Sequence, residues 1–105
     1  MGGRAATQSC FRLFMIPGMD HCFSGAGAFS IDYLSYLEAW VEKGQAPEKI
    51  IGAHADGLKW GNDYPCDPKV PIAFTRPIYP YPAIAKYKGK GDPNDAANFV
   101  PFNPK

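Results

Sequence analysis

An apolar run followed by a glycine-containing loop and an amphipathic pattern is the feature that most constrains this sequence. The run extends from Phe11 to Ile16 and stops at Pro17-Gly18. A nearly continuous run of this kind is typical of a strand buried on both faces, as in a parallel sheet. Leu34, Leu37 and Val41 then recur at spacings of three and four, which predicts a helix with one apolar face. This order favours an α/β fold.

Capping residues predict where this helix begins and ends. Ser30 is expected to be its N-cap, and Asp32 would place negative charge in the first turn, where the helix dipole favours it. At the other end, Lys43 falls in the last turn, Gly44 in the left-handed position and Pro47 three residues beyond. The helix is therefore expected to end at about residue 43.

The second half of the chain predicts short strands. Lys49–Ala55 and Val70–Arg76 are expected to be strands, although Pro71 confines the second to a sheet edge or an interrupted strand. Residues 56–68 between them are expected to form a loop. From Pro77 onward, recurring prolines and glycines argue against regular sheet for most of the tail.

The tail nevertheless holds too many large apolar side chains for a disordered linker. We expect it to lie in extended form against a larger body, with a short helical turn near residues 82–87. The residues that support this expectation are Ile78, Tyr79, Tyr81, Ile84, Tyr87 and Phe99.

Size and charge exclude several classes of protein. The 105 residues, with a mass of 11.5 kDa, allow one small domain or a piece of a larger one. Eleven basic and ten acidic side chains give a net charge of +1, so no strong field favours a nucleic acid or an anionic membrane as partner. The longest apolar run is far shorter than the roughly 20 residues that cross a bilayer, and the first residues do not resemble a signal peptide.

His21 is the candidate catalytic residue. It stands on the loop between the predicted strand and the predicted helix, which is where an α/β-hydrolase carries its triad histidine. A loop suits this role because the imidazole must reach the nucleophile's hydroxyl on one side and an orienting carboxylate on the other. By spacing alone the signal is weak, because a single loop histidine is more often structural or merely exposed.

Three blocks of sequence carry a more specific signal. FRLFMIPGMDHC at residues 11–22, YLEAWVEKGQAPEKIIG at 36–52 and TRPIYPYPAIAKYKGKGDPNDAANF at 75–99 follow one another. In this order they resemble the C-terminal part of the tannase/feruloyl esterase family of α/β-hydrolases. The resemblance covers roughly residues 11–99.

The resemblance implies a serine esterase that acts on small aromatic esters such as galloyl or feruloyl esters. His21 would take the proton from the attacking serine and pass it to the departing alcohol. Cys22 matches a cysteine that, in this family, forms a disulfide with a cysteine directly before the nucleophile; the alternative is a free buried thiol. An oxidising compartment, extracellular or periplasmic, is implied. No cofactor is expected, apart from a calcium ion that relatives carry in a lid region.

The nucleophile and the orienting acid are not found in this sequence. No serine stands in a G-x-S-x-G context, and Asp20, the only carboxylate before His21, is badly placed because it is the adjacent residue. Residues 1–105 are therefore expected to be the C-terminal part of one α/β-hydrolase domain. It would comprise a buried strand, an amphipathic helix, short edge strands and a long irregular tail, inactive without the N-terminal part. The alternative is a small non-catalytic binding or interaction module.

The sequence departs from the family at two positions where many relatives have paired cysteines. Tyr79 replaces one, and Val100-Pro101 stands where the other would follow. The tail is therefore expected to be held by packing of Tyr79, Tyr81 and Phe99 instead.

The remaining polar features are given structural interpretations. Cys10 and Cys66 fit no zinc spacing, and a bridge between them stays undecided. His54 is expected to be an exposed or hydrogen-bonded residue at a strand end. Gly25-Ala26-Gly27 is interpreted as a turn beside the substrate cleft, and Lys86, Lys88 and Lys90 as a solvated strip.

Overall fold

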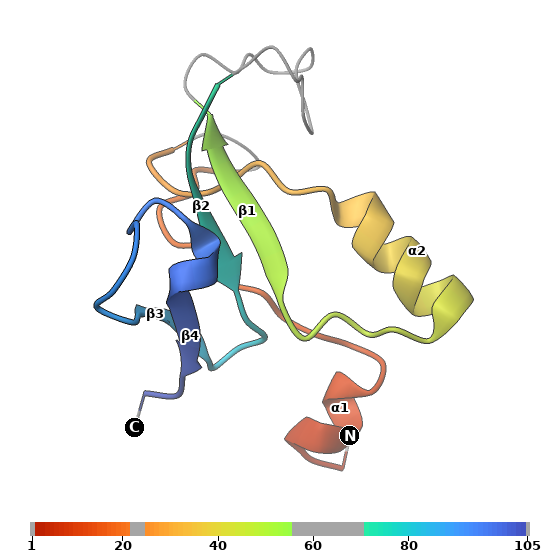
Figure 1. Cartoon of the computed structure of the whole chain (residues 1–105). Coiled ribbons are helices and arrows are strands. Elements are labelled where there is room, and N and C mark those ends of the chain that lie inside the picture. Colours follow the sequence, from red (N-terminus) through yellow and green to blue (C-terminus); the bar gives the residue numbers. More distant parts are fainter. Residues whose placement is uncertain (1, 22–24, 56–70, 105) are drawn as a thin grey trace.

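The computed structural model describes residues 2–21, 25–55 and 71–104. Its elements run in the order α1 (Arg4–Gln8), α2 (Tyr33–Lys43), β1 (Ile50–Ala55), β2 (Ile72–Ile78), β3 (Ile84–Tyr87), a 3-10 turn (Ala96–Asn98) and β4 (Phe99–Phe102). The strands form two separate antiparallel ribbons, β1–β2 and β3–β4. In the view of Figure 1, α2 lies on the β1 side of the central ribbon and β3–β4 on the β2 side.

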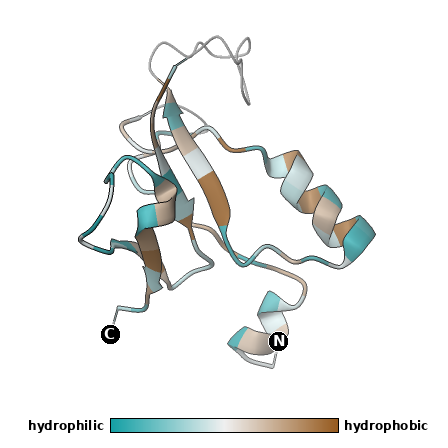
Figure 2. Cartoon of the chain, in the orientation of Figure 1, coloured by the Kyte–Doolittle hydropathy of each residue, from teal (hydrophilic) through white to brown (hydrophobic). Residues whose placement is uncertain are grey.

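The central ribbon confirms the two predicted strands, with bounds that differ by one or two residues, and pairs them antiparallel. Ile50 pairs with Ile78 and His54 with Phe74, and the register shifts between His54 and Ala55. β2 continues through Pro77, which is compatible with a ladder because no other described strand pairs with its second edge. The start of β1 is among the most hydrophobic segments of the chain (Figure 2).

A small core lies beside this ribbon. Ile31, Ile50 and Ile78 are its buried members, and Phe14, Ile16 and Tyr36 pack against them from partly buried positions. Ile31, at 1% exposure, is the most deeply buried. The core thus collects side chains from the apolar run at residues 11–16, from the segment just before α2, from both strands of the ribbon and from α2.

The expectation that residues 11–16 form a strand buried on both faces is wrong. Among the described residues, the segment's one pairing with another strand-like segment is an isolated bridge between Phe14 and Pro80, in which the Tyr81 N–H donates to the Leu13 carbonyl at 2.7 Å. Burial alternates along it. Phe11 and Met15, on the outer side, are 63% and 60% exposed, whereas Arg12, Phe14 and Ile16 are half-buried. One face therefore contacts the described part of the chain, and the other is open.

Helix α2 forms where predicted, with its first turn shifted. Asp32, rather than Ser30, is the N-cap: its carboxylate accepts bonds from the Ser35 N–H at 3.2 Å and the Ser35 hydroxyl at 2.6 Å. Ser30 is buried instead, exchanging two backbone bonds with Ala53 of β1. Gly44 ends the helix in the left-handed conformation, as predicted.

The apolar stripe of α2 does not face the core. Leu34, Leu37 and Val41 are 64%, 57% and 76% exposed. The helix is attached by its other residues: the Tyr36 hydroxyl accepts the Ile51 N–H at 2.9 Å, and the Trp40 ring lies 5.5 Å from the Arg12 guanidinium. The stripe predicted to be buried is thus an open apolar face.

The tail is more regular than predicted. The expected helical turn at residues 82–87 is wrong, because Ile84–Tyr87 form β3 and pair with β4. The prolines did not prevent this pairing, since Pro80 and Pro82 precede β3, and Pro101 is accommodated in a short two-stranded ribbon. Gly89 and Gly91 have φ of 83° and 84° in the connection, a conformation that glycine adopts without steric cost. Helix α1 was not predicted.

Arg76 joins the two ribbons. Its guanidinium lies 4.6 Å from the centre of the Phe74 ring and 4.7 Å from that of Phe99 on β4, and it donates to the Thr75 carbonyl at 2.8 Å. Phe99 therefore holds the tail as predicted, whereas Tyr81 is 58% exposed and contributes its backbone N–H. Among the described residues, no helix is both long and apolar enough to cross a membrane.

The position of Arg76 predicts that its removal lowers the free energy of unfolding more than removal of Lys86 does. Arg76→Met should lower the free energy of unfolding by about 2 kcal/mol, because it removes a half-buried cation between two rings. Lys86→Met is the matched control: Lys86 is exposed and faces one ring, Phe102, at 4.9 Å, so its loss should cost about 0.5 kcal/mol. Urea unfolding measures both. Equal costs would contradict the joining role of Arg76.

The cap of α2 predicts a pH response. The bonds from the Ser35 hydroxyl and then from its N–H lower the pKa of Asp32 below the ordinary value of 3.8. Because the pKa is depressed in the folded chain, the cap's stabilisation is present above pH 3.8 and is lost as the pH falls through the folded value. The Ser35 amide resonance should titrate with a midpoint below 3.8. A midpoint above 3.8 would show that the cap does not form.

Candidate functional site

His21 lies on a loop that is closed at its base by backbone contacts. Met19 and Gly25 form an antiparallel bridge, and the Gly27 N–H donates to the Gly18 carbonyl at 2.9 Å. His21 itself is exposed, and so is Asp20 beside it. The base of the loop is thus held together while the candidate imidazole is accessible from outside.

Glycine is required at the loop base because the two legs approach closely. A Cβ on Gly27 would overlap the Pro17 carbonyl oxygen, and a Cβ on Gly25 would overlap that of Gly18. Gly18 and Gly25 also have φ of 73° and 102°, where other residues are strained. Residues 25–27, interpreted from the sequence as a turn beside the substrate cleft, form a bridge residue followed by a bend, and the close approach of the two legs is the physical reason for their glycines.

His54 contacts the same loop base from the sheet. Its Nδ1 lies 2.8 Å from the Gly27 carbonyl oxygen. Because a carbonyl oxygen can only accept, Nδ1 must carry the hydrogen in this bond. The imidazole is stacked on Phe74, with centroids 4.9 Å apart and an angle of 5°, and meets the edge of Phe29 at 5.5 Å. Of the two expectations for His54, the hydrogen-bonded one is confirmed.

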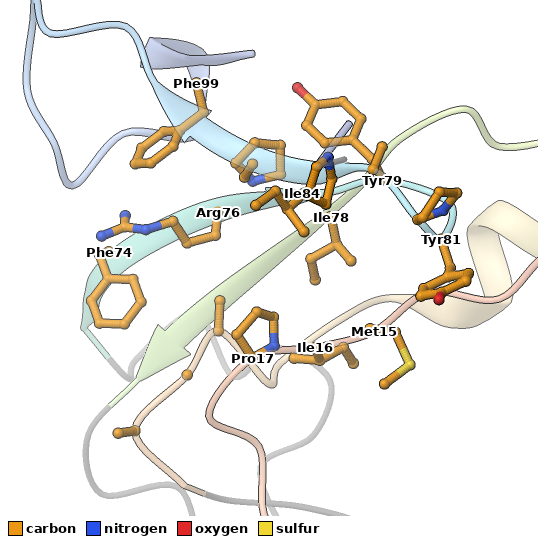
Figure 3. Close-up of a pocket in the computed structure, with 18 residues that line it drawn as sticks. Met15, Ile16, Pro17, Phe74, Arg76, Ile78, Tyr79, Tyr81, Ile84 and Phe99 are labelled. Carbon is orange, nitrogen blue, oxygen red and sulfur yellow. The ribbon is translucent and has the colours of Figure 1, made fainter. Parts of the chain in front are cut away.

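A hollow of about 720 Å³ extends from the loop base across β2 to the tail (Figure 3). Its walls are largely apolar, and Arg76 supplies the one charged side chain among the described residues that line it. Burial raises the pKa of the Tyr79 hydroxyl above its ordinary value of 10.0, so this group is neutral at pH 7. The remaining lining residues are Met15, Ile16, Pro17, Ala26, Gly27, Ala28, Phe74, Pro77, Ile78, Tyr81, Pro82, Ala83, Ile84, Ala85, Phe99 and Pro104.

The structure does not bring all predicted site residues together. Pro17 and Gly27 of the loop base line the hollow, whereas His21 is not among its described lining residues. Cys22 and Cys66 lie outside the described residues, and so does the predicted loop at 56–68. Cys10 is an exposed free thiol. In the part of the chain that is described, no three metal-ligating side chains gather.

Two contributors to this region were not foreseen. Phe74 and Arg76 share one face of β2, and their alternation in the sequence could have shown that much. The contacts of Phe74 with His54, and of Arg76 with Phe99, depend on strand register and on how the ribbons meet. Neither can be read from a single sequence.

Comparison with known proteins relates this region to esterases. The family model described as tannase and feruloyl esterase matches residues 1–101. The mono(2-hydroxyethyl) terephthalate hydrolase of Piscinibacter sakaiensis is 46% identical over 85% of this chain and 13% of its own length. A probable feruloyl esterase of Arthroderma benhamiae is 39% identical over 94% of this chain and 17% of its own length.

Solved structures agree with these relatives. An esterase from Aspergillus oryzae superposes with a TM-score of 0.77 at 28% identity, over 95% of this chain and 21% of that one. Feruloyl esterase B from the same organism gives a TM-score of 0.63 at 25% identity, over 93% of this chain and 20% of that one. This chain spans less than a fifth of the length of the curated relatives that it matches. With the family model covering almost all of it, the chain belongs to the tannase and feruloyl esterase family.

Proposed function

We propose that residues 1–105 are the histidine-bearing C-terminal part of a serine carboxylic-ester hydrolase that acts on aromatic esters. The observation that carries this proposal is the family match over residues 1–101, with His21 exposed on a loop closed by glycines. Relatives named for feruloyl esters and for a terephthalate ester have an aromatic acid in common. A small non-catalytic module is less well supported, because the family model and the relatives reported above are named for ester hydrolases.

His21 acts as the general base of this reaction. Its imidazole accepts the proton from a serine hydroxyl as the oxygen attacks the ester carbonyl, and then donates that proton to the departing alcohol. The glycine-closed base keeps the loop in place while the ring remains reachable from outside. The serine and the orienting carboxylate come from the part of the hydrolase that these residues do not include, so this chain alone does not turn over esters.

The open apolar faces support this division of the enzyme. The stripe of α2 and the outer side of residues 11–15 have the sequence pattern of core elements, yet they are exposed. In the complete hydrolase these faces pack against the preceding part of the same domain. Cys22 pairs with a cysteine beside the nucleophile, which fits an extracellular or periplasmic location. The reaction needs no cofactor, and any calcium ion belongs to the lid of the complete protein.

The role of His21 predicts a large and specific loss of activity. The test uses the product of the complete reading frame that encodes these residues, assayed with methyl ferulate and methyl gallate. His21→Ala should lower kcat/KM by about 10³-fold or more, because proton transfer to and from the serine is lost. Asp20→Asn is the control on the same loop and should retain wild-type activity. An active His21→Ala variant would refute the assignment.

The proposed division also predicts where α2 is covered. Leu37→Cys should react with a thiol probe in the 105-residue chain, where Leu37 is 57% exposed. In the complete product the same position should be protected at least 10-fold, because the stripe is packed. Peptide mapping by mass spectrometry separates this thiol from the native cysteines. Equal labelling in both proteins would show that the stripe does not pack against the preceding part of the domain.

A further inference from the structure

We propose that His54 is a positioning residue: it holds the base of the His21 loop against β1, in the position that catalysis requires. The inference rests on the proposed function, in which His21 is the general base. It starts from one contact: the His54 Nδ1 donates to the Gly27 carbonyl at 2.8 Å. This bond joins the central ribbon to the base of the loop.

Gly27 is the residue at which the loop can be fixed. Its N–H donates to Gly18 on the opposite leg, while its carbonyl accepts from His54. The same residue therefore fastens the two legs to each other and both legs to β1. Residue 27 cannot carry a side chain that would make further contacts, because a Cβ there would overlap the Pro17 carbonyl oxygen. The side chain that fastens this point must come from elsewhere, and it comes from β1.

The chain beyond Gly27 leads directly into the sheet. Ala28 and Phe29 are buried, and Ser30 exchanges two backbone bonds with Ala53, the residue before His54. The loop thus has a firm anchor after residue 27. At Gly27, the bond from His54 adds a side-chain attachment of the loop base to β1. A displacement of Gly27 would move both legs together.

The His54 ring is itself held in a fixed orientation. It lies parallel to Phe74, its partner in the β1–β2 register, and the edge of Phe29 meets it nearly at right angles. Side chains of paired residues lie on one face of a ribbon, so the imidazole cannot turn away without losing the stacking. Both the neutral Nδ1–H form and the imidazolium donate from this atom, so the bond does not depend on the ring's charge.

Three substitutions separate the hydrogen bond from the packing, in the product of the complete reading frame. His54→Phe keeps an aromatic ring between Phe29 and Phe74 but has no donor. His54→Asn removes the ring but can place an amide N–H near the position of Nδ1. Tyr36→Phe is the matched control, because it also deletes a hydrogen bond to β1, the one with the Ile51 N–H, at the strand's opposite end.

Two measurements are made on each variant. The first is kcat and KM with methyl ferulate or methyl gallate, whichever the wild-type enzyme hydrolyses. The second is hydrogen exchange of the Gly27 amide, which reports the loop base without any assay of activity. We expect His54→Phe to lower kcat at least 10-fold with KM within 2-fold, and to speed Gly27 exchange at least 10-fold. His54→Asn should recover most of both, and Tyr36→Phe should match wild type.

The proposal is overturned if His54→Phe keeps the wild-type kcat or leaves Gly27 exchange unchanged. It is also overturned if His54→Asn lowers kcat as much as His54→Phe does, because the packing of the ring, and not the hydrogen bond, would then determine kcat. A failure of the proposed function looks different: His21→Ala would then keep its activity. In that case Gly27 exchange in the His54 variants still tells whether the ring fastens the loop base.

Discussion

The stacking of planar side chains across both ribbons is the interaction on which the described structure depends. The buried core is small, with three isoleucines at its centre, so it cannot hold the tail and the His21 loop by itself. The additional attachment is a row in which each ring or guanidinium contacts the next. The row consists of Phe29, His54, Phe74, Arg76, Phe99 and Tyr87. It begins beside the loop base and ends on β3, and part of it forms a wall of the hollow (Figure 3).

Arg76 explains how the tail can be held without a disulfide. A guanidinium is flat and weakly hydrated, so it can lie between two rings and still donate a hydrogen bond from its edge. Here the rings are on β2 and β4, and the edge donates to Thr75. A further contact is made by the Thr75 hydroxyl, which accepts the Ala96 N–H at 2.8 Å. These contacts connect β2 to β4 and to the turn that precedes β4, although β2 and β4 are not paired by backbone hydrogen bonds. They provide an attachment of the tail that does not depend on a disulfide.

Local signals predicted the parts of the fold that depend on neighbouring residues. Gly44 ends α2 because only a residue free of steric strain takes the left-handed position there, and the strands at β1 and β2 follow from their apolar, β-branched composition. Prediction failed where distant contacts decide. Ser30 is a good N-cap by type, but its backbone is paired with Ala53, so Asp32 caps the helix. The tail strands form because β3 and β4 meet each other, although prolines surround them.

The candidate site divides in the same way. His21 could be proposed from its place after the apolar run and from the resemblance to a family, because both are properties of the sequence. The contact between His54 and Gly27 joins residues 27 positions apart, and no sequence feature of either segment predicts it. A histidine in a strand is ordinary, and so is a glycine in a turn. Only the register of β1 against β2, and the path of residues 27–30 along β1, bring the two together.

The disagreement between sequence pattern and exposure is informative in itself. Periodicity in a sequence reflects the burial of each residue in the whole folded protein, whereas the exposures here are those of 105 residues alone. Leu34, Leu37 and Val41 have the spacing of a core-facing helix and are more than half exposed. Exposed apolar area on this scale is costly in water, at about 25 cal/mol per Å² left unburied. A helix with such a stripe therefore implies a covering surface, and residues 11–15 imply a second one on the same argument. The two open apolar faces support the proposal that residues 1–105 are one part of a larger hydrolase domain, and the chain spans less than a fifth of the length of the curated relatives reported above.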